Sequence, residues 1–237
     1  MLRRPSRQEN NKCESSMPAF RTEDSIYYFA HVPKCGGTSI ERGLEETGIT
    51  LSLHDPDWWG HQGTHWNRSS PQHMPKDALA RLFAPDFFDY SFGFVRDPVE
   101  RFLSAFNFNR GLGRLPRRQS LKRFLTQLEK SGDYFENSFD NHFLPADRFI
   151  SEDCMVFRLE DGMDAVTEWL DKTSGGRIKA SFGHHQKSYP EGNRPMDFME
   201  KIRGKSIEPE RITAKALDTT TRSRIEMLYR LDYDRFY

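Results

Sequence analysis

Apolar residues fall into short continuous runs and into more widely spaced positions, and these two patterns predict strands and helices in turn. Residues Ser25–Val32 form a nearly continuous aromatic and β-branched run, typical of a strand buried on both faces of a parallel sheet. Aromatic residues alternate with smaller ones over Asp89–Arg96, and Met155–Leu159 is another short apolar run. The pattern therefore predicts strands that are well separated along the chain.

Between and after these strands, apolar residues recur three or four positions apart, as expected for helices packed on a core. Ile40 and Leu44 show this spacing just after the first strand. Another helix is predicted to start after the second strand, where Asp97 can act as N-cap, Pro98 fits the first helical position and Glu100 completes a capping box. The other predicted helices span 75–83 (apolar face Ala78, Leu79 and Leu82), 120–130 (Leu121, Phe124, Leu125 and Leu128), 163–171 and 223–231.

Strands that alternate with helices predict an α/β protein with a central, mainly parallel sheet flanked by helices. The length of 237 residues fits a single domain. Residues 1–24 are polar with little apolar content, so we expect a flexible N-terminal tail before a domain that covers 25–237. Residues 51–70 show no period, and a loop of this length is often functional.

Charge and cysteine content narrow the possible functions. The 35 basic and 35 acidic residues balance, whereas a nucleic-acid-binding domain is usually basic overall, so no nucleic-acid partner is expected. The three cysteines are widely spaced and suggest neither a disulfide framework nor a metal site. We find no apolar run long enough to span a bilayer and no secretory signal, which favours a cytoplasmic protein.

The loop after the first strand has the composition of a phosphate-binding loop. Gly36 and Gly37 allow the backbone to approach a ligand closely, and Thr38 and Ser39 follow at the expected start of a helix, where free N–H groups favour a phosphate. Lys34 adds a positive charge, but it precedes the glycines, so an ATP site of the Walker type is not indicated. An ordinary strand-to-helix turn that contains glycines is the alternative interpretation.

A second candidate stretch lies where the second strand ends. Arg96 is expected at the carboxyl end of that strand, the place where ligands collect in open α/β sheets, and its guanidinium can bind a phosphate. Ser104 can face the same ligand only if its helix runs alongside it. Pairing of Arg96 with a carboxylate, and helix packing by Ser104, are equally compatible with the pattern.

Taken together, residues 31–39 and 95–104 resemble the PAPS-binding motifs of the sulfotransferase superfamily. The likeness is to the carbohydrate group that includes heparan sulfate 2-O-sulfotransferase and the chondroitin and dermatan sulfotransferases. It continues through 157–160 and 228–236, so it covers about 25–237. The resemblance implies a P-loop-like nucleotide-binding fold, PAPS as sulfuryl donor with PAP as product, and a carbohydrate acceptor. Relatives in eukaryotes are usually membrane-anchored Golgi proteins, so a Golgi location would require an anchor outside this chain.

The resemblance also assigns roles to residues. Lys34 would bind the 5′-phosphosulfate and steady the leaving oxygen, and Arg96 and Ser104 would hold the 3′-phosphate. Residues 184–188 fall where the family has a polar loop over the nucleotide, although Gln186 stands where Asn is more usual. The residues expected to bind the nucleotide are Lys34, Cys35, Gly36, Gly37, Thr38, Ser39, Arg96, Ser104, Lys187 and Ser188.

The acceptor hydroxyl needs a general base, and histidine suits that task near neutral pH. In the 2-O-sulfotransferase group the base lies upstream of the second motif, an interval that holds His61, His65 and His73 here. We expect His73 to be the base and His65 to be the second candidate. A surface histidine without a role is the alternative for each. No zinc-ligand spacing accompanies them, so no metal is expected.

A basic segment suggests where an acidic acceptor would bind. Residues 109–126 contain six basic residues and no acidic one. This segment is predicted either to form a solvated surface or to bind an acidic or already sulfated glycan. Trp58, Trp59 and Trp66 could stack on sugar rings or be buried in the core. The residues expected to bind substrate are Arg110, Arg114, Arg117 and Arg118.

Two other functions remain open from the sequence. A P-loop kinase-like phosphotransferase would depend on magnesium, and no convincing Mg²⁺ carboxylate accompanies the glycine loop. A non-catalytic glycan- or nucleotide-binding protein could share the fold, since fold does not imply function. The presence of Lys34 and of candidate bases favours an enzyme. The sequence indicates no oligomeric state.

Overall fold

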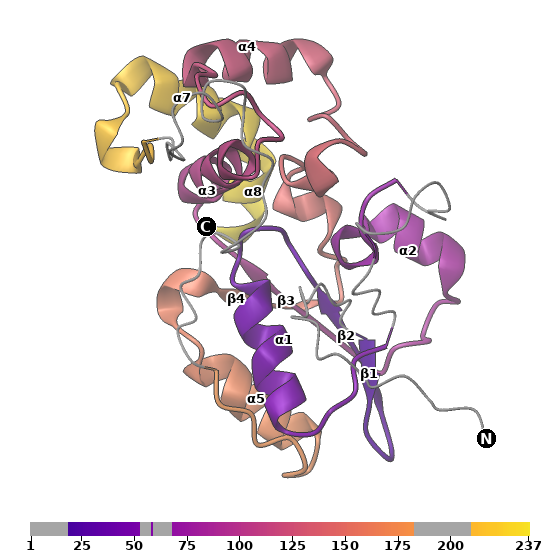
Figure 1. The fold of residues 1–237 in the computed structure, drawn as a ribbon. Coiled ribbons are helices and arrows are strands. Elements are labelled where there is room, and N and C mark those ends of the chain that lie inside the picture. The colour runs from indigo at the N-terminus through magenta and orange to yellow at the C-terminus, as the bar shows by residue number, and fades with distance from the viewer. Residues whose placement is uncertain (1–18, 53–57, 59–67, 183–209) are drawn as a thin grey trace, which may run out of the picture.

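The computed structural model describes residues 19–52, 58, 68–182 and 210–237, and within them it forms one α/β layer structure (Figure 1). A four-stranded sheet has the order β1-β2-β3-β4, in which β1 is antiparallel to β2 and the other neighbours are parallel. This confirms the predicted fold class. The strands are β1 (Ala19–Arg21), β2 (Ile26–Ala30), β3 (Tyr90–Val95) and β4 (Met155–Arg158).

Aromatic rings stack across the sheet and fix its register. Phe29 on β2 lies opposite Phe92 on β3, and their ring centroids are 5.1 Å apart. Phe94 on β3 is paired with Phe157 on β4 in the same way, at 5.5 Å. Cross-strand aromatic pairs stabilise a sheet beyond the area they bury. The register brings the carboxyl ends of β2, β3 and β4 to the same edge.

The prediction of a flexible tail over residues 1–24 is wrong for the residues that form β1. Ala19–Arg21 forms β1, and Ala19 and Phe20 are buried. The Phe20 ring stacks on Tyr27 of β2 at 4.9 Å between centroids. A strand of three residues is too short to show a hydrophobic period, so the pattern could not reveal it.

Helices follow each parallel strand and then gather at one end of the molecule. In Figure 1, α1 and α5 lie beside the sheet, whereas α3, α4, α7 and α8 cluster above its upper end. Two buried cores result, one around the sheet and one among α3, α4 and α7. No helix of the described ranges is long and apolar enough to cross a membrane. The helices are α1 (Gly37–Glu46), α2 (Lys76–Leu82), α3 (Pro98–Gly111), α4 (Leu121–Ser131), α5 (Asp164–Thr173), α7 (Thr219–Leu228) and α8 (Arg230–Phe236), with short 3₁₀ turns at Pro71–His73, Phe139–Asn141, Ala146–Arg148, Leu159–Asp161 and Ala214–Ala216.

Several helix predictions are confirmed, and two details differ. Leu121, Phe124, Leu125 and Leu128 are buried as expected, but Leu82 on α2 is 56% exposed because this short helix packs on the sheet only through Leu79. The predicted terminal helix is two helices that meet at Tyr229.

The predicted cap of α3 is half right. The Asp97 carboxylate accepts the Glu100 N–H at 2.9 Å, as a capping box requires. The Asp97 N–H, however, donates to the carboxylate of Glu160 at 2.7 Å instead of to Glu100. A residue that follows β4 therefore completes the cap and fixes the start of α3 against the sheet.

Candidate active site

The loop between β2 and α1 presents free backbone donors at the carboxyl edge of the sheet. Within the described ranges, the N–H groups of Gly36, Gly37 and Thr38 donate to no backbone carbonyl, as expected at a helix N-terminus. Those of Cys35 and Ser39 donate to Val32 and Gly36. The loop therefore offers three N–H groups to an anion, and Cys35 and Ser39 do not contribute theirs.

Each glycine of the loop has a structural requirement. Gly36 adopts a left-handed backbone with φ of 85°. A Cβ on Gly37 would lie 1.9 Å from Nε2 of His31, so only glycine lets this histidine pack beneath the loop. His31 is buried with its Nδ1 2.9 Å from the carboxylate of Glu41 on α1. The glycine pair thus serves the turn and a close contact with His31, a structural role that does not depend on a ligand.

Lys34 and Cys35, which precede the glycines, differ in character. The ammonium of Lys34 lies 3.7 Å from the centroid of the Phe108 ring. Burial, together with the nearby positive charge of Arg96, lowers the pKa of Lys34 to about 8. Burial raises the pKa of the Cys35 thiol to about 12, which makes it unreactive at neutral pH.

Helix α3 runs alongside the loop, and Lys34 of the loop contacts Phe108 of this helix. Apart from its C-terminal Gly111, only Glu100, Ser104 and Phe108 along this helix are half-buried, while its other positions are buried. These three residues are four positions apart and so share one face. The guanidinium of Arg96 lies 3.5 Å from the carboxylate of Glu100 at one end of the face. The ammonium of Lys34 lies over the Phe108 ring at the other end. Ser104 therefore lies between the two expected phosphate-binding cations.

His73 is buried at the end of a short 3₁₀ turn and is hydrogen-bonded to the carboxylate of Asp140. Its Nδ1 lies 2.8 Å from Oδ2 of Asp140, a residue 67 positions away in sequence. Asp140 also accepts the Ser70 N–H at 2.6 Å and the Ser70 hydroxyl at 3.0 Å. Because a carboxylate only accepts, Nδ1 of His73 carries the proton and Nε2 is left with a lone pair. This is the arrangement of an oriented general base.

The charges around this pair keep the histidine neutral. Burial lowers the pKa of His73 below its ordinary value of 6.5, with His31 acting in the same direction and Asp140 opposing. Although burial opposes it, the imidazole of His73 holds the pKa of Asp140 well below its usual range. An uncharged His73 beside an ionised Asp140 is the form present at neutral pH.

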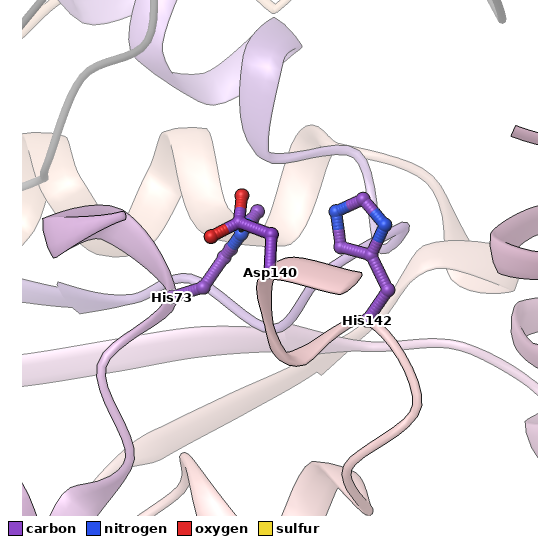
Figure 2. Close-up of side chains that lie close together, drawn as sticks. All are labelled: His73, Asp140 and His142. Atoms are coloured by element: carbon purple, nitrogen blue, oxygen red, sulfur yellow. Dashed lines mark hydrogen bonds and ion pairs between the residues drawn. The ribbon is translucent and has the colours of Figure 1, made fainter. Parts of the chain in front are cut away.

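A second buried histidine, His142, completes the cluster shown in Figure 2. Its ring centroid is 5.1 Å from that of His73 and 5.2 Å from that of Phe108. Side-chain atoms of His73, Asp140 and His142 lie within 4.8 Å of one another, so the trio has the composition of a metal site. One oxygen of Asp140 is hydrogen-bonded to Nδ1 of His73, an arrangement that orients an imidazole either as a base or as a metal ligand.

The segment that carries Asp140 and His142 has an unusual backbone. Six non-glycine residues between 134 and 141 have positive φ, Asp140 among them at 58°. Such conformations are costly for ordinary residues and persist where the surrounding structure imposes them, often at functional sites. Sequence reasoning missed Asp140 and His142, although the polar triplet at 140–142 between aromatic residues was a signal that could have found them.

Tertiary contacts from the end of the chain hold this segment in place. Asp232 accepts the N–H groups of Ala146 and Asp147 at 2.8 and 3.0 Å, and it pairs with the buried Arg101 at 3.6 Å. Arg101 in turn donates to the carbonyls of His142 and Leu144. Residues 228–236, the stretch near the C-terminus that resembles the family, therefore hold the segment of Asp140 and His142 in place through Asp232; we call this contact the Asp232 brace.

Three predicted site residues lie outside the described residues, namely His65, Lys187 and Ser188. Others make structural contacts. The guanidinium of Arg110 donates to the carbonyls of Arg117 and Glu210, so these structural contacts hold it in place. Trp58 is buried, as the packing alternative held.

The remaining predicted arginines lie on one side of the site. Arg114 is partly buried, and burial lowers its pKa, with nearby Asp140 opposing. Arg117 and Arg118 line a cavity of about 470 Å³ between α3, α4 and α7, together with Lys122 and Arg211. The positive charge of Arg211 also acts on Lys34.

One comparison with known proteins identifies the family. A model of the sulfotransferase family matches residues 18–237, nearly the whole chain. No curated protein and no solved structure shows a significant match. The matched range begins one residue before β1 and includes all the described elements.

Proposed function

The chain belongs to the sulfotransferase family, and we propose that it transfers the sulfuryl group of PAPS to a carbohydrate hydroxyl, with His73 as general base. The observation that carries the proposal is the convergence of two units at one edge of the sheet. One is the loop of Lys34 with its free N–H groups, and the other is the His73–Asp140 pair. Phe108 and His142 connect them through ring contacts of about 5 Å or less.

The donor nucleotide would be held from both ends. The N–H groups of Gly36, Gly37 and Thr38 and the ammonium of Lys34 suit the 5′-phosphosulfate. Arg96 suits the 3′-phosphate, because its guanidinium is half-buried and its only ion pair within the described ranges is with Glu100. The hydroxyl of Ser104 on the same helix face supports this assignment.

The proposed reaction is an in-line displacement at sulfur. Nε2 of His73 takes the proton of the acceptor hydroxyl as its oxygen bonds to sulfur. The bond between sulfur and the bridging phosphate oxygen breaks, and its electron pair stays on that oxygen. Lys34 and the loop N–H groups stabilise the charge that gathers there. The products are the sulfate ester, PAP and a protonated His73, which returns its proton to water.

The nature of the acceptor is inferred from charge. The cavity between α3, α4 and α7 is lined by five basic residues and two acidic ones (Arg110, Arg117, Arg118, Lys122 and Arg211; Glu210 and Asp218). An excess of positive charge suits carboxylate or sulfate groups of an acidic glycan. This supports Arg117 and Arg118 as acceptor contacts, joined by Arg211, and Arg114 is a further candidate. Lys122 is already paired with Asp218 at 3.0 Å.

Calorimetric titration with PAP and with ATP tests the donor. We expect PAP to bind without metal and ATP to bind weakly with or without magnesium. Arg96→Ala should lose PAP binding, whereas Arg81→Ala, an exposed arginine on α2, should keep it. Failure of the folded protein to bind PAP would refute the proposal, and magnesium-dependent ATP binding would indicate a phosphotransferase instead.

The acceptor is tested with labelled PAPS and a panel of polysaccharides. Heparosan, chondroitin and dermatan should take up label, and a neutral glycan such as dextran should not. Arg118→Glu should raise the KM for the accepted polysaccharide and leave PAP affinity unchanged, because Arg118 is exposed in the cavity wall. Labelling of dextran in preference to the acidic chains would overturn the charge argument.

A further inference from the structure

His142 is the one member of the buried cluster for which the proposed mechanism has no role. It is only 3% exposed and it lies between the general base and Lys34. Its ring contacts His73 on one side and Phe108, which carries the Lys34 ammonium, on the other. The acceptor oxygen and the leaving oxygen must be in line at sulfur, so the sulfuryl group lies between His73 and Lys34 during its transfer. His142 lies next to this position.

The tautomer of His142 is fixed by Asn109 of α3. The amide nitrogen of Asn109 lies 2.8 Å from the carbonyl of Ala105 and 3.0 Å from Nδ1 of His142. Turning the amide over would place two oxygens 2.8 Å apart, so the nitrogen must face both groups. Nδ1 of His142 therefore accepts a hydrogen bond, and the ring proton is on Nε2.

The two histidines thus have opposite tautomers. His73 donates from Nδ1 to Asp140 and presents a lone pair at Nε2, whereas His142 accepts at Nδ1 and presents an N–H at Nε2. Figure 2 shows one nitrogen of His142 turned toward His73 and Asp140. Within the part of the chain that the structure describes, this Nε2 has no hydrogen-bond partner, and no ion pair joins His142 to Asp140.

From this arrangement we infer that His142 is a second catalytic residue, which donates its Nε2 hydrogen to an oxygen of the sulfuryl group in transfer. The inference rests on the proposed function. His73 and His142 then act as acceptor and donor toward the two partners that form the new bond. A neutral N–H donor stabilises the charge on the sulfuryl oxygens. Unlike an imidazolium, it does not release a proton that could protonate His73.

The electrostatic surroundings agree with a neutral donor. Burial lowers the pKa of His142 well below its ordinary value of 6.5, and the positive charges of Lys34 and Arg114 act in the same direction. The ring therefore stays uncharged at neutral pH.

The first test is the tautomer itself, read from long-range ¹H–¹⁵N spectra of the labelled protein at pH 7. We expect His142 to carry its proton on Nε2 and His73 on Nδ1. A proton on Nδ1 of His142 would overturn the inference. This readout requires neither nucleotide nor turnover, so it is independent of whether the proposed function is correct.

The second test compares His142→Phe with His142→Gln. Phe keeps the ring contacts but has no donor, and Gln places an N–H near the position of Nε2. Single-turnover release of PAP from PAPS, with water as acceptor, should slow by about 10²–10³-fold in the Phe variant and by about 10-fold or less in the Gln variant. Unchanged PAP affinity in both would show that the site is intact, because PAP lacks the sulfuryl group.

The outcomes separate the two claims. A wild-type rate in His142→Phe, or equal loss in both variants with PAP affinity intact, would refute the donor role of His142. The acid limb of the pH profile should stay in place in both variants, since it belongs to His73. If the wild-type protein fails to bind PAP, the proposed function fails, whatever the tautomer spectrum shows.

Discussion

Exchange of Asp140 for asparagine tests the proposed general base most directly, because it keeps the size of the side chain while it reverses the hydrogen bond to His73 and removes the buried negative charge. In Asp140→Asn the new amide would keep its oxygen on the Ser70 N–H, which lies 2.6 Å from the native carboxylate. Its NH₂ group would turn toward Nδ1 of His73, which lies 2.8 Å from the other carboxylate oxygen. His73 must then accept at Nδ1 and carry its proton on Nε2. The Ser70 hydroxyl can rotate to accept, so no buried polar group loses its partner.

The magnitude follows from the loss of base catalysis alone. General-base catalysis contributes about 10²–10⁴-fold, so kcat of Asp140→Asn should fall by that factor, or about 3–5 kcal/mol in the barrier. PAP affinity should stay unchanged, because Asp140 is not among the groups expected to hold the nucleotide. Asp153→Asn, the same change at an exposed carboxylate, is the matched control and should keep full activity.

The pH dependence gives a second readout. His73 must be unprotonated to act, and its pKa lies below 6.5, so the wild-type rate should rise with pH up to about that value. It should fall again above about pH 8, where Lys34 loses the charge that stabilises the leaving oxygen. In Asp140→Asn the rate should be low at every pH. A variant with wild-type kcat and a wild-type acid limb would refute the assignment of His73 as the base oriented by Asp140.

Three further changes test other parts of the site. The pKa of Lys34 is lowered to about 8, so PAP affinity should weaken as pH rises above 8, and Lys34→Gln should remove this dependence in titration calorimetry. Gly37→Ala brings a methyl group within 1.9 Å of His31 and should destabilise the protein by about 1–3 kcal/mol in urea unfolding; wild-type stability would contradict the close packing. Asn137 is exposed with φ of 62°, so Asn137→Val should cost about 1–2 kcal/mol while Asn137→Gly is neutral or stabilising, and equal stabilities would argue against the left-handed backbone.

Much of the fold could be predicted from the sequence because each long element carries its own period. The strand before the loop, the start of α3 at Asp97 and the buried face of α4 all follow from local patterns. The edge strand at Ala19–Arg21 did not, because three residues show no period and their burial depends on Tyr27 of the next strand.

The candidate site divides in the same way. The loop of Lys34 and the position of Arg96 are local features, readable from glycines and from the end of a strand. The partners of His73 are not, since Asp140 reaches it from a segment whose left-handed backbone no propensity foretells. Likewise, the use of Arg110 as a bridge to backbone carbonyls depends on a loop a hundred residues later.

The brace formed by Asp232 has a consequence for how the protein becomes active during synthesis. The carboxylate of Asp232 holds the backbone at Ala146 and Asp147 and pairs with Arg101, which in turn supports the carbonyl of His142. Domains can begin to fold from the N-terminal side while the ribosome is still adding residues. The loop of Lys34 and the sheet can form early, but the histidines proposed to be catalytic gain their support only after α8 has emerged. A nascent chain that stops short of this helix would therefore carry the loop proposed to bind the nucleotide without the support of the proposed base.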